Sequence, residues 1–350
     1  MKRRIIVVAA LSVMIAGTAL ITFAQSAQSQ APAVKTKTAP NSAKTRRTPW
    51  GDPDLQGIWN IATSTPLQRP DRVTGKTVLT DEEASEFAEE LAHELNRDRR
   101  DGGPDADVNR AYNEHWMDAR RLEIVKDKRT SLIVDPADGR IPPLVPPTPA
   151  VQKRREAGAA AARRFAAGMP WGPEEMSNPV RCIIRTDRPP YLPTIYNNTY
   201  QIFQSPGYVT ILVEMIHSAR IIPLDGRPHL RPGLRQWLGD TRGRWDGDTL
   251  VVQTTNFRPD STFGEADPST YKLTERFTRI DANTIAYEFT VEDPTTWTRP
   301  WTAIIPWNKT QDQLYEYACH EDNYDIVHLL AGARKREKAG EGAAAEGTAR

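Results

Sequence analysis

The sequence predicts a mainly β protein in which an antiparallel meander closes into a barrel or packs as a sandwich, with helices before it and one helix after it. From residue 199 onward, short runs rich in β-branched and aromatic residues alternate with tight turns. Asp246-Gly247 stands between two such runs, and this dipeptide is a strong hairpin signal. Closely spaced strands joined by short turns favour antiparallel neighbours, which then form a barrel or a sandwich.

The N-terminus has the pattern of a secretory signal. Residues 2–4 are basic, an apolar run extends from Ile5 to Phe23, and small and polar residues follow. We expect cleavage after Ala24, with Ala27 as the second choice. The run is long for a signal peptide, so an uncleaved N-terminal anchor is the alternative. The sequence therefore predicts a periplasmic or secreted protein.

The composition changes along the chain and indicates its organisation. The predicted layout is a signal peptide at 1–24, a disordered tether at 25–47, a single β-rich domain at 48–338 and a disordered tail at 339–350. Within the domain, the part up to about residue 175 is helical, residues 176–322 are rich in strands, and residues 324–338 form a C-terminal helix. A division into two domains near residue 175 is the alternative.

Two helices are predicted before the strands. Thr80 and Glu83 form a capping box ahead of an apolar stripe that ends at Leu95. Thr148 caps the second helix, and Pro149 occupies its first turn. The Ala- and Arg-rich composition of the second helix indicates a position on the surface.

The strands follow in chain order. A first hairpin is expected from Ser131–Val134 and Arg140–Leu144 around the turn at residues 135–139. The later strands are predicted at Thr199–Phe203, Tyr208–Ile216, Arg220–Leu224, the hairpin Gly243–Val252, Tyr271–Ile280, Thr284–Val291, Trp301–Trp307 and Gln313–Cys319.

The charge balance argues against a nucleic-acid partner. The whole chain has a formal net charge of +1, and its first thirty residues hold three basic residues and no acidic one, which leaves the mature chain near −2. Such a chain has no general attraction for nucleic acid or anionic membranes. After the N-terminal segment, no apolar stretch is long enough to span a bilayer.

Cys182 and Cys319 are the only cysteines. In an oxidising compartment two distant cysteines favour a single disulfide. Two separate buried thiols are the alternative, because sequence spacing does not show whether the residues meet.

Several segments together resemble a large family of secreted bacterial proteins usually described as hypothetical proteins. The segments are Trp50–Gly57 (Trp-Gly-Asp-Pro-Asp-Leu-Gln-Gly), Asn178–Cys182, Tyr196–His229, the Gly243–Thr255 segment with Gly-Arg-Trp-Asp-Gly-Asp-Thr-Leu-Val-Val, and Thr274–Glu321. The resemblance covers nearly the whole mature chain. It implies membership of the family and brings no activity or catalytic residue with it.

Two polar clusters at strand ends are candidates for catalysis. Glu214 and His217 follow the most apolar strand, and an imidazole beside a carboxylate can divide acid and base roles. Arg220 beyond them is a candidate substrate-binding residue, since its guanidinium could hold a substrate carboxylate or a developing oxyanion. Strand alternation places Glu214 and His217 on opposite faces unless the chain turns there. His320 and Glu321 form the second cluster at the exit of the last strand, where a barrel mouth would admit a ligand. Ordinary solvated polar turns are the alternative explanation of both clusters.

A third cluster precedes the Asp-Gly hairpin. Asp240 is a candidate catalytic carboxylate, and Trp237 and Arg244, with Arg235 and Arg242, are candidates for binding an anionic or hydroxylated ligand. A structural Asp–Arg network is the alternative and the favoured interpretation.

Two weaker groups complete the candidates. Residues 113–116 (Asn-Glu-His-Trp), with Asp118 and Arg120, place Glu beside His. Aromatic residues that could stack on sugars, but that strands more often bury in the core, are Tyr191, Tyr196, Trp297, Trp301 and Trp307, with Arg299 among them.

Missing motifs exclude several enzyme classes. The sequence has no Gly-x-Ser-x-Gly elbow, no phosphate-binding Gly-rich loop, no Cys-x-x-Cys and no His-Glu-x-x-His. No two histidines stand at close metal-ligand spacing, so no metal and no organic cofactor is expected.

Three functions fit these observations. The first is a polar-lined pocket for a small organic molecule, with acid–base chemistry of a lyase, isomerase or hydrolase. The second is a non-catalytic carrier of an apolar or carbohydrate ligand. The third is an envelope interaction protein without a pocket, marked by an exposed aromatic patch.

Overall fold

The computed structural model describes residues 46–109, 117–118, 122–321 and 323–340. The predicted signal peptide, nearly all of the tether and most of the tail lie outside the described residues. The strands are β1 (Gly57–Asn60), β2 (Ile133–Asp135), β3 (Thr199–Ser205), β4 (Tyr208–Val213), β5 (Ala219–Pro223), β6 (Asp240–Asp246), β7 (Thr249–Thr255), β8 (Lys272–Arg279), β9 (Thr284–Glu292) and β10 (Trp301–Lys309). The α-helices are α1 (Asp81–Leu95), α2 (Gly103–Asn109), α3 (Pro149–Ala166) and α4 (Asp325–Lys338), and short 3-10 turns lie at Asp71–Val73, Pro173–Glu175 and Met215–His217.

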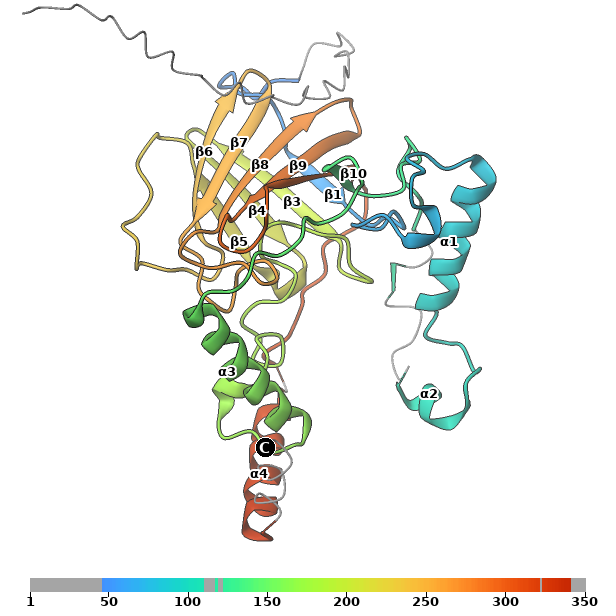
Figure 1. The fold of residues 1–350 in the computed structure, drawn as a ribbon. Helices are drawn as coiled ribbons and strands as arrows, with labels where there is room; N and C mark the ends of the chain where they lie inside the picture. Colours follow the sequence, from blue (N-terminus) through green and yellow to red (C-terminus); the bar gives the residue numbers. More distant parts are fainter. Residues whose placement is uncertain (1–45, 110–116, 119–121, 322, 341–350) are drawn as a thin grey trace, which may run out of the picture. The chain divides into compact units, whose positions relative to one another are not determined.

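The strands form one antiparallel sheet that nearly closes into a barrel, as Figure 1 shows. The order is β5-β4-β3-β1-β10-β9-β8-β7-β6, and β2 pairs with β10 beside this path. The predicted mainly β meander is therefore confirmed, and the structure selects the barrel over the sandwich.

The two ends of this path, β5 and β6, approach each other through side chains rather than through a backbone ladder. Arg220 Nε of β5 donates to Thr241 Oγ1 of β6 over 3.2 Å. A Cβ atom added at Gly243 of β6 would lie 2.6 Å from Ile222 Cγ2 of β5, so only glycine allows this approach. We call this β5–β6 junction the seam.

Side chains fill the inside of the barrel. Strand alternation directs one residue in two inward, and these residues are predominantly large and apolar. Tyr191, Tyr200, Tyr287, Phe277 and Trp307 contact one another with ring centroids 4.7–6.0 Å apart. The barrel is thus a packed core. Most of the aromatic residues considered for sugar stacking, including Tyr191, Trp301 and Trp307, belong to this core.

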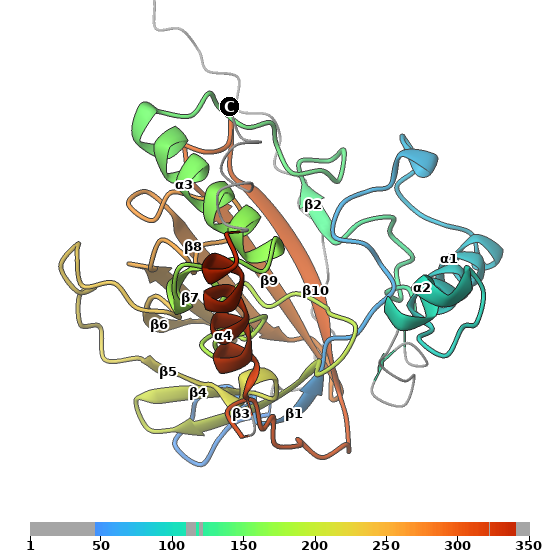
Figure 2. The same cartoon turned by 90° about the horizontal axis from the view of Figure 1, so that it is seen from below.

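The helices begin where their caps predict. The capping box of Thr80 and Glu83 opens α1, and Thr148 accepts a hydrogen bond from Val151 N at the start of α3. Val151 is the only fully buried residue described in α3, which confirms a surface helix. Figures 1 and 2 show α3 and α4 side by side. No helix in the described part of the chain has the length and apolar character needed to cross a membrane.

Two predicted strands are wrong. Residues 313–319 form no strand, because β1 already pairs with β3 and β10 and offers no free edge to the chain that leaves β10. Residues 140–144 do not pair with the segment before them either, because Ile133 and Asp135 pair with β10 instead. In both cases a distant partner decides the pairing.

Candidate functional site

The chain turns sharply between β4 and β5, as one interpretation of the sequence requires. Ile216 and His217 have φ values of 60° and 46°. This left-handed conformation is costly for a β-branched residue such as Ile216. The turn brings Glu214, which precedes it, and His217, which lies within it, to the same neighbouring segment.

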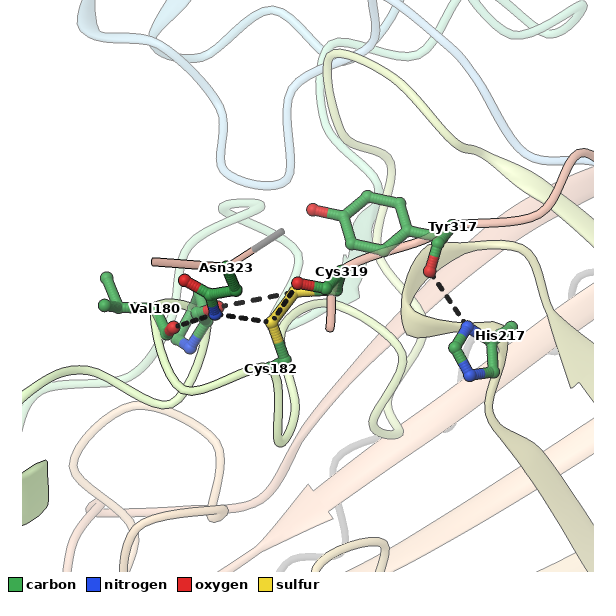
Figure 3. The surroundings of a disulfide bond; sticks show 7 residues. Val180, Cys182, His217, Tyr317, Cys319 and Asn323 are labelled. Carbon is green, nitrogen blue, oxygen red and sulfur yellow. Dashed lines mark hydrogen bonds between the residues drawn. A yellow bond between two sulfur atoms is a disulfide. The ribbon is translucent and has the colours of Figure 1, made fainter. Parts of the chain in front are cut away.

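Glu214 and His217 both hold the segment that follows β10. Tyr315 N donates to Glu214 Oε1 over 3.2 Å. His217 Nδ1 lies 2.9 Å from the carbonyl oxygen of Tyr317, as Figure 3 shows. Because a carbonyl only accepts, Nδ1 carries the proton in this contact. These two predicted catalytic side chains therefore act as anchors for residues 315–317.

The predicted disulfide between Cys182 and Cys319 is confirmed, with the Cα atoms 5.7 Å apart (Figure 3). Asn323 Nδ2 donates to the carbonyl oxygen of Val180 over 3.0 Å beside it. His320 and Glu321 are exposed in the turn between these two attachments. No hydrogen bond among the described residues joins their side chains to Glu214 or His217.

Two acids at this end of the barrel have raised pKa values. Burial raises the pKa of Asp187, whose carboxylate accepts hydrogen bonds from Arg185 N and Ser218 Oγ. Burial also raises the pKa of Glu214. Asp187 was not among the predicted site residues, because its contact with Ser218 is visible only in the folded structure.

Arg220, a predicted substrate-binding residue, lies inside the barrel and is inaccessible. Its side chain is 2% exposed and that of Glu275 is 0% exposed. Arg220 Nη1 donates to Glu275 Oε1 over 3.0 Å, and Nη2 donates to Thr254 Oγ1 over 2.7 Å. Tyr287 donates its hydroxyl proton to Glu275 Oε1 over 2.8 Å. Burial alone lowers the pKa of Arg220, but the Glu275 carboxylate reverses this and raises it.

Asp240 pairs with a histidine that the sequence analysis did not select. His229 Nδ1 lies 3.0 Å from Asp240 Oδ2, and Leu230 N donates to the same oxygen over 2.7 Å. Arg242 Nη1 donates to Asp240 Oδ1 over 2.7 Å. Asp240 is 3% exposed, so this set fixes the loop before β6 as the structural Asp–Arg network predicts.

The other members of the third cluster, Trp237, Arg235 and Arg244, lie outside the hydrogen-bonded set around Asp240. The guanidinium of Arg258 lies 4.3 Å from the ring centroid of Trp237. Arg235 donates to the carbonyl oxygens of Phe257 and Pro268. Arg244 is exposed on β6. Residues 113–116 and Arg120 of the fourth cluster lie outside the described residues, and Asp118 accepts a hydrogen bond from Asn198 Nδ2.

A pocket of about 500 Å³ lies beside α1, away from all of these clusters. Its wall is mainly apolar. The lining residues are Thr63, Ser64, Thr65, Pro66, Leu67, Pro70, Arg72, Phe87, Glu90, Leu91, Glu94, Leu132, Leu192 and Pro193. None of the predicted catalytic or substrate-binding residues is among them.

Ser64 is the exceptional polar group in this wall. The flanking hydroxyls are engaged: Thr63 Oγ1 donates to Glu123 O over 2.6 Å, and Thr65 Oγ1 accepts from Val125 N over 2.9 Å. Ser64 is 4% exposed, and its Oγ has no hydrogen-bond partner among the described residues. Buried hydroxyls are normally paired, so the Ser64 hydroxyl has an unused hydrogen-bonding capacity at the pocket wall.

The rim of the pocket carries charge. Arg72 forms an ion pair with Glu90, and its guanidinium lies 3.9 Å from the ring centroid of Phe87. Glu94 adds a second carboxylate. The sequence shows the apolar stripe of α1 with Phe87 and Leu91, but only the structure shows that no residue of α1 is fully buried and that both side chains line the pocket.

Comparisons with known proteins add no family. No protein-family model matches the chain, and no curated protein matches it in sequence. Within the described residues, no group of three or more His, Cys, Asp or Glu side chains is arranged to hold a metal ion.

Proposed function

We propose that the protein binds a small, mainly apolar organic molecule with one hydrogen-bonding group, in the pocket beside α1. The observation that carries this proposal is the Ser64 hydroxyl, which is buried in an apolar wall without a partner. A bound molecule that places a donor or acceptor at Ser64 satisfies this group.

The size and lining of the pocket support the same class of molecule. Its volume of about 500 Å³ falls in the range of small-molecule sites. Leu67, Leu91, Leu132 and Leu192 give the molecule an apolar surface to cover. The Arg72–Glu90 pair at the rim stays hydrated and accepts a polar group that projects from the pocket.

This proposal favours a carrier over an acid–base enzyme. Glu214 and His217 anchor a neighbouring segment, and Asp240 anchors a loop. None of these groups lines the pocket. The proposal also includes export to the periplasm or the cell exterior and membership of the secreted bacterial family. Both of these rest on the sequence segments alone.

Titration with N-phenyl-1-naphthylamine tests the proposal. This neutral dye is apolar, carries one N–H group and becomes fluorescent in apolar surroundings. We expect saturable binding to the wild type and about fivefold weaker binding to Ser64→Ala, since one hydrogen bond is lost. Leu91→Trp fills the pocket and should abolish saturable binding.

A matched control lies on the same helix. Ser85 is exposed on α1 and donates to Glu89, so Ser85→Ala removes a hydroxyl outside the pocket and should bind the dye like the wild type. Equal dye affinity in the wild type, Ser64→Ala and Leu91→Trp would overturn the proposal.

A further inference from the structure

The C-terminal ends of α3 and α4 meet and form a basic surface. Arg334 donates to the carbonyl oxygens of Pro170 and Trp171, and Arg336 donates to that of Ala167. These contacts tie the two helices and the segment between α3 and the next turn together, in agreement with Figures 1 and 2. The basic tip is the name used here for Arg163, Arg164, Trp171, Arg334, Lys335, Arg336 and Lys338.

The basic tip is a local excess of charge in a nearly neutral chain. Residues 149–176 and 325–340 hold nine Lys or Arg and five Asp or Glu, while the whole chain has a net charge of +1. Arg164 pairs with Glu175, and Arg334 pairs with Glu337.

Three cations remain without an ion pair among the described residues. Arg163, Lys335 and Lys338 are exposed, and no carboxylate of the described chain lies within ion-pair distance of them. Cations at helix C-termini are stabilised by the helix dipole, which explains part of the pattern. The dipole does not explain the exposed Trp171 that accompanies them.

One large aromatic side chain is exposed in the basic tip. Trp171 is 61% exposed, and the guanidinium of Arg164 lies 3.7 Å from the centroid of its ring. Aromatic rings beside Lys and Arg are characteristic of surfaces that lie in the headgroup region of a bilayer.

We propose that the basic tip docks on an anionic phospholipid surface. The unpaired cations are complementary to the phosphates of that surface, and Trp171 enters the headgroup region beside them. The charge contribution acts only within a Debye length, so docking weakens as salt concentration rises. The exposed Trp distinguishes this partner from duplex nucleic acid, whose bases are already stacked on one another and offer no apolar phase.

Co-sedimentation with vesicles tests the proposal on the full mature chain. Vesicles of phosphatidylglycerol and phosphatidylcholine in equal parts should sediment the wild type, and vesicles of phosphatidylcholine alone should not. Lys335→Glu with Lys338→Glu should weaken sedimentation by at least about tenfold. The matched control is Lys126→Glu with Lys309→Glu, which reverses two exposed lysines elsewhere and should bind like the wild type.

Quenching by brominated lipid tests the orientation independently. The tryptophan fluorescence of the wild type should fall on anionic brominated vesicles, and Trp171→Phe should lose this quenching while it keeps most of the sedimentation. Equal loss of binding in both double variants would overturn the proposal, since general charge would then suffice. Equal affinity for duplex DNA and for anionic vesicles would also overturn it.

Discussion

The buried charges inside the barrel and the buried Ser64 hydroxyl beside α1 differ in their hydrogen bonding. Inside the barrel, Arg220 and Glu275 satisfy each other, and Thr254 and Tyr287 engage the remaining atoms. In the pocket, the Ser64 hydroxyl is just as deeply buried but has no partner among the described residues.

The difference follows from charge, since the neutral Tyr191 hydroxyl and Trp307 indole N–H inside the barrel also lack a partner among the described residues. A charge buried in the barrel must be paired, since an unpaired one costs several kcal/mol. Arg220 of β5 reaches Thr241 of β6 and Thr254 of β7, so the pair also joins the two sides of the seam. An unpaired neutral hydroxyl costs far less and can be kept for a ligand.

The largest expected effect is the loss of one partner of the buried pair. Glu275→Ala leaves the Arg220 guanidinium buried without its carboxylate, and should lower the free energy of unfolding by about 3–5 kcal/mol. Urea denaturation followed by tryptophan fluorescence measures this. The double variant Arg220→Met with Glu275→Leu should recover most of the loss, because no unpaired charge remains. A single variant as stable as the wild type would show that the pair does not hold the seam.

Removal of the disulfide should have the next largest effect. Cys182→Ala with Cys319→Ala frees the segment after β10, and should lower the free energy of unfolding by about 2–4 kcal/mol, the typical effect of a disulfide. The same variant should bind N-phenyl-1-naphthylamine like the wild type, since neither cysteine lines the pocket. Parallel loss of dye binding in the folded variant would show that the two regions are coupled.

A smaller effect is expected in the pH dependence of the free energy of unfolding, through Glu214. Burial raises the pKa of Glu214 above its ordinary value of 4.5, so the folded state binds more protons than the unfolded state between these two values. The free energy of unfolding should therefore fall as pH rises through that window. Glu214→Gln should flatten this part of the stability curve, measured by urea denaturation between about pH 4 and pH 7. An unchanged slope would contradict the raised pKa.

The smallest expected effect on stability is that of removing the Ser64 hydroxyl. Ser64→Ala removes a buried hydroxyl that has no partner to lose, so the free energy of unfolding should stay within about 0.5 kcal/mol of the wild type. Thermal and urea denaturation provide the measurement. A loss above about 1 kcal/mol would mean that Ser64 makes a structural hydrogen bond, and would remove the basis of the proposed site.

Local sequence signals predicted the elements that depend on neighbouring residues. Caps at Thr80 and Thr148 act within one helical turn, and the Asp246-Gly247 turn joins two strands that are adjacent in the chain. The same local reasoning failed for residues 140–144 and 313–319, where pairing depends on strands far away in the sequence.

The buried Arg220–Glu275 pair and the pocket show the same limit of local sequence reasoning, because their residues come from distant segments. Glu275 follows Leu273 and precedes Phe277 on the apolar face of its strand, which is a visible signal of a buried charge. Nothing local connects it to Arg220, which lies 55 residues away. The pocket joins α1 to residues 63–67 and 192–193, so its lining cannot be inferred from any one segment.

The sequence by itself determined the mainly β class, the capped helices and the two cysteines that could pair, because strand alternation, capping and turn chemistry operate between near neighbours. Only the tertiary structure decided that the meander closes into a barrel, that Arg220 is enclosed and that Ser64 remains unpaired. The physical reason is that burial and hydrogen-bond satisfaction are properties of contacts between distant segments, and those contacts exist only once the chain has folded.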